Sequence, residues 1–134
     1  MAKTQLFRSG KGSESLLVIE DQDSVRALIV QALKQDGYRV IEAANGEEAL
    51  RAAAAQPEPI QALVTDVIMP KMSGLVVAEH LRNIWPGTRV LFMSGYVDPT
   101  NPGFLEEPGT AFIQKPFLPD DLAWHLRDLL DRPI

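Results

Sequence analysis

Short apolar segments alternate with segments of helical periodicity along most of this chain, and this alternation constrains the fold more than any other feature. The apolar runs that predict strands lie at residues 15–19, 38–43, 60–65, 89–93 and 111–114. The segments whose apolar spacing predicts helices lie at residues 23–36, 45–56 and 74–85, and from residue 119 onward. Strands that alternate with helices through short loops indicate an α/β domain, in which helices cover both faces of a parallel sheet.

Two segments depart from the alternation. Residues 1–14 are mostly polar and contain Gly10 and Gly12, which predicts an N-terminal tail or linker before a single domain over residues 15–134. Residues 98–109 contain three prolines, which leave room only for a short or irregular fourth helix.

The composition excludes several classes of protein. The 134 residues include no cysteine, which excludes disulfides, a thiolate metal site and a cysteine nucleophile, and suits a reducing compartment. Thirteen Lys and Arg against 18 Asp and Glu give a net charge of −5, so direct binding of nucleic acid is not expected. No apolar run approaches the ~20 residues that span a bilayer, and residues 1–14 are too polar for a signal peptide. We therefore expect a cytoplasmic protein without a membrane partner.

Ionisable and hydroxyl side chains follow four of the five predicted strands. They are Glu20 and Asp21 after the first strand, Asp66 after the third, Ser94 after the fourth and Lys115 after the fifth. In an open parallel sheet, ligands bind outside the carboxyl ends of the strands. The second strand offers no ionisable group there, which suits an edge position in the strand order 2-1-3-4-5. We therefore expect three carboxylates, a hydroxyl and a lysine at one edge of the sheet.

Three carboxylates at one edge repel one another unless positive charge lies among them. Oxygen ligands without nearby His or Cys favour a hard cation, and Mg²⁺ over Ca²⁺ where few protein ligands are available. Such a cation together with Lys115 balances the charges of Glu20, Asp21 and Asp66. A pocket neutralised in this way suits phosphoryl transfer, in which an aspartate can form an acyl phosphate.

Four motifs, in the same order along the chain, reveal a family resemblance. The segments LLVIED at 16–21, LVTDVIMPKMSG at 63–74, VLFMSG at 90–95 and FIQKPF at 112–117 resemble the receiver domain of two-component response regulators. The resemblance covers residues 15 to about 130. It implies a flavodoxin-like, doubly wound (βα)5 fold and a phosphorylation-dependent switch in a two-component phosphorelay.

The resemblance implies a chemical role for each residue of the site. Asp66 would accept a phosphoryl group from the phosphohistidine of a histidine kinase or phosphotransfer domain, and Lys115 would contact a phosphoryl oxygen. Mg²⁺, for which Mn²⁺ can substitute, would be bound by Asp21, by Glu20 mainly through water, by Asp66 and by the backbone carbonyl of Ile68.

Further residues would sense the phosphoryl group. Ser94 would be the switch hydroxyl, Phe112 the aromatic switch, and the bond from Lys115 to Pro116 would be cis. The backbone N–H groups that would contact phosphoryl oxygens belong to Val67, Ile68 and Gly95. The sequence departs from the family pattern at Glu20, where Asp is frequent, and at Ser94, where Thr is common.

Two forms of the whole protein stay open. Residues 12–18, 93–96 and 114–117 resemble receivers at the C-terminal end of hybrid sensor histidine kinases, so the chain is either a fragment of such a kinase or a stand-alone receiver. The face that contains the fourth helix is used for dimerisation by many family members, so a homodimer is also open.

Other functions fit the sequence less well. The resemblance implies self-phosphorylation and autodephosphorylation, not turnover of an external substrate. A haloacid-dehalogenase phosphatase has a second aspartate two residues after its nucleophile, where this chain has Ile68. A flavodoxin-like FMN binder needs a Ser/Thr/Gly-rich loop after the first strand, where residues 20–23 carry three acids. The alternative that stays open is a pseudo-receiver, a scaffold that binds partners without phosphorylation.

Overall fold

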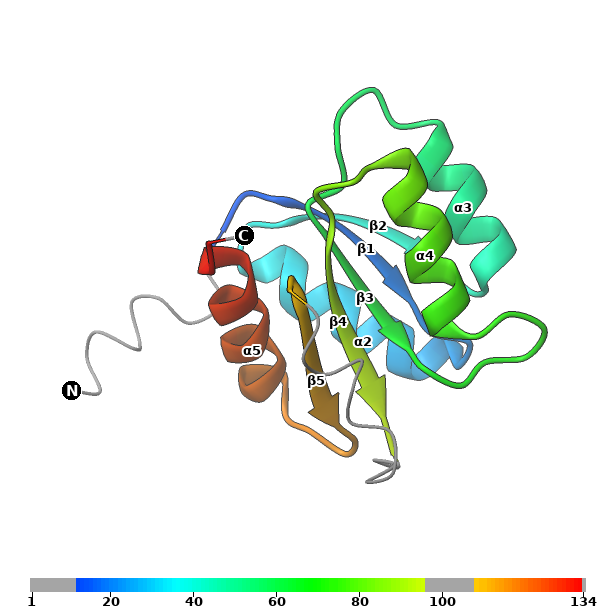
Figure 1. Ribbon diagram of the computed structural model, residues 1–134. Helices are drawn as coiled ribbons and strands as arrows, with labels where there is room; N and C mark the ends of the chain where they lie inside the picture. Colours follow the sequence, from blue (N-terminus) through cyan, green and yellow to red (C-terminus); the bar gives the residue numbers. More distant parts are fainter. Residues whose placement is uncertain (1–11, 96–107, 134) are drawn as a thin grey trace.

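The computed structural model describes residues 12–95 and 108–133, and within them five parallel strands form one sheet in the order β2-β1-β3-β4-β5 (Figure 1). The strands are β1 (Ser15–Ile19), β2 (Arg39–Ala43), β3 (Ala62–Asp66), β4 (Arg89–Ser94) and β5 (Thr110–Gln114). The helices are α2 (Asp23–Gln35), α3 (Gly46–Ala54), α4 (Gly74–Ile84) and α5 (Pro119–Asp131). The predicted doubly wound α/β fold and its strand order are confirmed.

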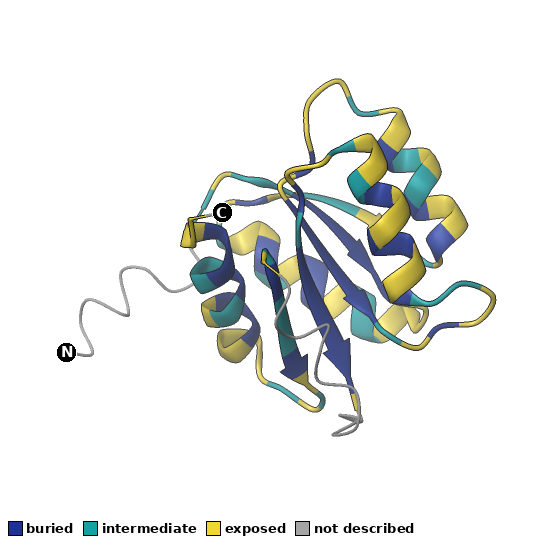
Figure 2. Cartoon of the chain, in the orientation of Figure 1, coloured by how far each residue is buried: buried dark blue, intermediate teal, exposed yellow. Residues whose placement is uncertain are grey.

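The sheet lies between two layers of helices, α2 and α5 on one face and α3 and α4 on the other (Figure 1). Alternate residues of β1 show why its apolar run has no polar gaps: Leu16 and Val18 pack toward α2 and α5, and Leu17 and Ile19 toward α3 and α4. All four are fully buried, and the central strands β1, β3 and β4 are mostly dark blue in Figure 2. The sheet is therefore a rigid base for whatever lies at its edge.

Local sequence signals mark the ends of several helices. The Asn45 side chain accepts a hydrogen bond from the Glu48 N–H at 2.8 Å, and Ser73 Oγ accepts one from the Val76 N–H at 3.3 Å, which cap α3 and α4. After α2, Gly37 adopts a positive φ of 101°, a conformation that glycine enters without a steric penalty.

Two strands, β3 and β4, end one residue later in the structure than the sequence pattern predicts. Asp66 and Ser94, which the sequence pattern places just after their strands, are the last residues of β3 and β4. Asp66 pairs with Met93 across the two strands, and Ser94 pairs with Gln114 of β5. The backbones of both residues are thus held by the sheet, and only their side chains extend from its edge.

The short or irregular helix is expected in residues 98–109. Most of this segment belongs to residues 96–107, which lie outside the described residues. Residues 12–14, which the sequence assigns to the tail, contact the domain through Glu14, whose carboxylate lies 2.7 Å from Arg127 Nη2. The boundary at residue 15 stays a prediction. In the part of the chain that the structure describes, no helix has the length and apolar character needed to cross a membrane.

Candidate functional site

The three predicted carboxylates converge at the carboxyl edge of the sheet. Asp66 ends β3 between the two neighbouring strands β1 and β4, and Glu20 directly follows β1. Glu20 is 1% exposed and Asp66 6%, whereas Asp21 is exposed. Glu20, Asp21 and Asp66 each offer a carboxylate oxygen, and these three oxygens lie within 4.8 Å of one another. One exposed and two buried carboxylates therefore surround a small volume that solvent can reach.

Lys115 reaches the carboxylates from the end of β5, the edge strand next to β4. It follows β5, and its Nζ lies 2.6 Å from Asp66 Oδ1 and 2.8 Å from Glu20 Oε1. The peptide bond between Lys115 and Pro116 is cis. The Lys115 N–H donates to the carbonyl oxygen of Ser94 at 2.7 Å, which ties the lysine backbone to the end of β4.

Burial and mutual contact shift the pKa values of the clustered groups. Burial raises the pKa of Asp66 to about 6, and the neighbouring Glu20 adds to the rise while the hydrogen bond from Lys115 opposes it. Burial also acts to raise the pKa of Glu20, but hydrogen bonds from Lys115 and from the Gln22 N–H outweigh it and the pKa is lowered. Desolvation acts to lower the pKa of Lys115, but the two carboxylates outweigh it and the pKa is raised. At neutral pH all three groups are therefore predominantly charged.

The cluster fits a divalent metal ion by its charge and its donor atoms. Three carboxylates and one ammonium leave two negative charges, which a divalent cation would neutralise. All the side-chain donors are oxygens, the donors that Mg²⁺ prefers. Ile68, predicted to contribute its backbone carbonyl, lies in the β3–α4 loop with its side chain 78% exposed. Glu20, Asp21 and Asp66 are thus the side chains that could hold such an ion.

The β3–α4 loop packs closely on the backbone of Asp66. The Gly74 N–H donates to the carbonyl oxygen of Val67 at 2.8 Å, which brings the start of α4 against the end of β3. A Cβ atom at Gly74 would lie 2.0 Å from the Asp66 carbonyl oxygen. The close approach explains why glycine stands at this position of the sequence motif.

The residues predicted to sense a phosphoryl group lie on β4, on β5 and in the segments that follow β3 and β4. Ser94 is buried at the end of β4, and Phe112 is half-buried in β5 against the core beneath α3 and α4. Of the three backbone groups predicted to contact phosphoryl oxygens, the Val67 N–H already donates to the carbonyl oxygen of Met93 at 3.0 Å. It therefore serves the β3–β4 pairing in this structure. Ile68 and Gly95 are exposed, in the segments that follow β3 and β4.

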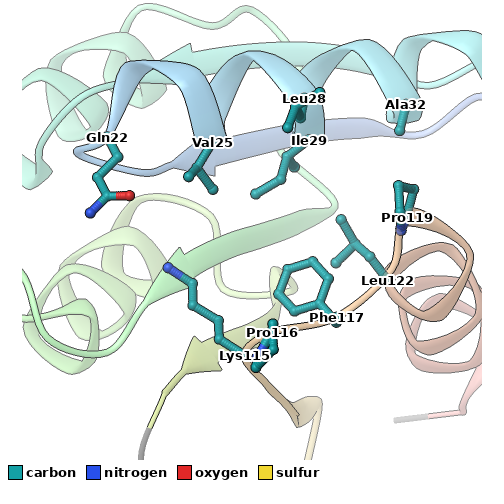
Figure 3. Close-up of a pocket in the computed structure, with 10 residues that line it drawn as sticks. All are labelled: Gln22, Val25, Leu28, Ile29, Ala32, Lys115, Pro116, Phe117, Pro119 and Leu122. Atoms are coloured by element: carbon teal, nitrogen blue, oxygen red, sulfur yellow. The ribbon is translucent and has the colours of Figure 1, made fainter.

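An apolar groove of about 400 Å³ runs from the cluster along α2, between this helix and the β5–α5 loop. Figure 3 shows Val25 and Ile29 of α2 facing Phe117 across it, with the Lys115 amine at the end of the groove nearest Gln22, and Leu28 also lines the groove. Leu28 is 66% exposed although it belongs to the helical apolar pattern of residues 23–36. The sequence pattern does not predict the groove, because helical periodicity cannot distinguish Leu28 from a core residue.

The raised pKa of Asp66 predicts an unusual pH dependence of stability in metal-free protein. Because the folded state binds this proton more tightly than an unfolded aspartate with a pKa of 3.8, stability rises as the pH falls from about 6 to about 4. The lowered pKa of Glu20 acts in the opposite direction and removes stability as the pH falls below 4.5. We expect the melting temperature in EDTA to rise as the pH is lowered from 7 to 5, and protonation of Glu20 to oppose this rise below pH 4.5. Asp66→Asn should lack the rise, and an equal rise in this variant would contradict the assignment to Asp66.

Comparisons with known proteins place this chain in a family. The response regulator receiver domain matches the chain over residues 16–127. The sensor kinase CckA of Brucella abortus (strain 2308) is 35% identical over 122 residues, which are 90% of this chain but 13% of that kinase. The response regulator receiver protein CpdR of the same organism is 32% identical over 117 residues, 87% of this chain and 90% of CpdR. The chain thus spans a small part of one relative and nearly all of the other.

Solved structures show the same fold. The receiver domain of the hybrid histidine kinase CckA is 35% identical and superposes with a TM-score of 0.76, covering 87% of this chain and 99% of that domain. The chemotaxis protein CheY4 of Vibrio cholerae, 26% identical, gives a TM-score of 0.77 over 88% of this chain and 99% of CheY4. Together with the match over residues 16–127, these likenesses show that the chain belongs to the response regulator receiver domain family of two-component systems.

Proposed function

We propose that this receiver domain is a phosphorylation-dependent switch in which Asp66 accepts a phosphoryl group from a phosphohistidine, with Mg²⁺ as cofactor. The observation that carries the proposal is the cluster itself: Asp66 lies at a solvent-accessible edge with Glu20 and Asp21 beside it and the Lys115 ammonium 2.6 Å from its Oδ1. This combination of a carboxylate nucleophile, a cation and two further acidic ligands supports phosphoryl transfer more directly than any other chemistry.

Each residue contributes to the transfer in a specific way. A carboxylate oxygen of Asp66 forms a bond to phosphorus as the bond from phosphorus to the donor imidazole nitrogen breaks, and the product is an acyl phosphate. Because its pKa is about 6, Asp66 is mostly ionised and able to attack at neutral pH. Lys115 stabilises the negative phosphoryl oxygens. Asp21, Asp66, the Ile68 carbonyl and, mainly through water, Glu20 would hold a divalent ion, which would supply the positive charge that the phosphoryl group needs.

The residues that would respond to phosphorylation of Asp66 lie on β4 and β5. Ser94 is buried and its carbonyl oxygen accepts the Lys115 N–H, so a movement of this residue toward the phosphoryl group would be transmitted to β5. Phe112 lies on β5, paired with Phe92 of β4, and would follow. The pairing supports the switch roles of Ser94 and Phe112.

The partner is a histidine kinase or a phosphotransfer domain, and the groove beside α2 is its contact surface. A donor that reaches Asp66 must approach the edge at which Lys115 lies, and the groove begins at this lysine (Figure 3). Apolar side chains of a phosphohistidine-bearing helix would cover Leu28 and the other apolar groups of the groove. The absence of cysteine suits the cytoplasm, where such partners present their histidines.

Treatment with acetyl phosphate and Mg²⁺ tests the function. The wild-type protein should gain one phosphoryl group that is labile to hydroxylamine, seen by intact-protein mass spectrometry or on a Phos-tag gel. Asp66→Asn should gain none, because an amide cannot form the acyl phosphate. Asp120→Asn, at an exposed position of α5, should be labelled like the wild type. Unchanged labelling of Asp66→Asn would exclude Asp66 as the acceptor, and an unlabelled wild type would favour a pseudo-receiver.

A further inference from the structure

Arg26 makes an unusual set of contacts beside the acidic cluster. From the second turn of α2, its Nη1 donates to the backbone carbonyl oxygen of Glu20 at 2.7 Å. Its Nη2 lies 2.7 Å from Asp23 Oδ1 and its Nε 3.3 Å from Glu42 Oε1. The Arg26 side chain is only 16% exposed. The planar guanidinium thus connects the β1–α2 turn, the first turn of α2 and strand β2.

The carbonyl that Arg26 binds belongs to the peptide unit between Glu20 and Asp21. The direction of this peptide sets the directions in which both side chains leave the backbone. The Glu20 carboxylate has further support, since it accepts hydrogen bonds from Lys115 and from the Gln22 N–H at 3.0 Å. The Asp21 carboxylate has no hydrogen bond within the described residues, so its direction depends on the backbone.

The start of α2 offers little other support for this turn. Gln22, the N-cap residue, forms no side-chain hydrogen bond with the helix. The Glu20 N–H donates to the carbonyl oxygen of Ala43 at 3.3 Å, which holds one side of the Glu20 backbone, and Arg26 holds the other side. Loss of the guanidinium would free the peptide to rotate.

We propose that Arg26 is a positioning residue for the metal centre, which orients Asp21 and Glu20 toward a divalent cation through the Glu20 carbonyl oxygen. The inference rests on the proposed function, because the ion is the Mg²⁺ of that function. The geometry of the planar guanidinium supports this role, because Nη1 binds the Glu20 carbonyl oxygen while Nε is anchored on Glu42 of β2.

The charge and the geometry of Arg26 predict opposite effects, and this makes the inference testable. A positive charge near the cluster repels a metal ion, so removing that charge without other consequences would tighten metal binding. Loss of orientation would weaken it, and removal of a residue that orients metal ligands typically raises the dissociation constant about 10-fold or more. We infer that orientation dominates.

The experiment measures Mn²⁺ binding to the full chain by electron paramagnetic resonance of the free ion. Arg26→Met removes both the charge and the planar set of guanidinium donors, and Arg26→Lys keeps the charge but not that set of donors. We expect both to raise the Mn²⁺ dissociation constant about 10-fold. Arg51→Met is the matched control, because it removes an equal charge at an exposed pair with Glu47 on α3, and it should bind Mn²⁺ like the wild type.

Other results would overturn the inference. Tighter binding by Arg26→Met together with wild-type binding by Arg26→Lys would show that Arg26 acts only through its charge. A lower melting temperature of both variants in EDTA with unchanged dissociation constants would show a structural role only. Failure of the wild type itself to bind Mn²⁺ would instead contradict the metal of the proposed function, and the labelling of Asp66 remains a separate measurement.

Discussion

Mg²⁺ is expected to raise the melting temperature of the wild-type protein by several degrees, and Asp21→Ala is expected to lose most of this response. In metal-free protein the carboxylates of Glu20, Asp21 and Asp66 repel one another, and Lys115 compensates only part of their charge. A ligand that binds only the folded state at 100 times its dissociation constant adds about 2.7 kcal/mol of stability. In a domain of this size such a gain corresponds to several degrees.

Differential scanning fluorimetry across a Mg²⁺ titration measures this response. Because Asp21 is exposed, its removal opens no cavity in the core, and Asp21→Ala should be at least as stable as the wild type in EDTA. Asp120→Ala, which removes an exposed acid of α5 that is not part of the cluster, should keep the full Mg²⁺ response. A full response in Asp21→Ala would remove Asp21 from the set of metal ligands.

Gly74→Ala is expected to destabilise the protein by about 3 kcal/mol, the upper part of the usual range for overpacked sites. A Cβ atom at this position would lie 2.0 Å from the Asp66 carbonyl oxygen and 3.1 Å from Thr65 Cγ2. The first of these contacts is with backbone, which cannot rotate away. The higher helix propensity of alanine, about 1 kcal/mol, is smaller than this effect.

The same substitution should also impair phosphoryl acceptance, since relief of the contact must displace the Asp66 backbone or the start of α4. Urea unfolding and labelling with acetyl phosphate measure the two effects. Gly87→Ala is the matched control, because a Cβ atom at Gly87 meets nothing within 4 Å, and it should be nearly neutral in both assays. Wild-type stability of Gly74→Ala would mean that the β3–α4 loop adjusts without moving Asp66.

The sequence by itself determined the sheet and the composition of the site. The apolar runs of this chain are short and separated by helical patterns, and parallel strands connected in this way place all their carboxyl ends at one edge. Glu20, Asp21, Asp66 and Lys115 were therefore predictable as neighbours, although Lys115 and Glu20 are 95 positions apart. The four family motifs added roles that neither spacing nor composition supplies.

Only the tertiary structure decided how these residues are held. Strand pairing extends β3 through Asp66 and engages the Val67 N–H with Met93, and neither follows from the sequence pattern, because a strand ends where its neighbour stops pairing. The contact of Arg26 with the Glu20 carbonyl, the approach of Gly74 to Asp66 and the groove beside Leu28 likewise depend on distances between separate elements. A periodic pattern indicates which face of a helix is apolar, but how closely that helix lies to a particular carbonyl or loop is set by packing of the whole domain.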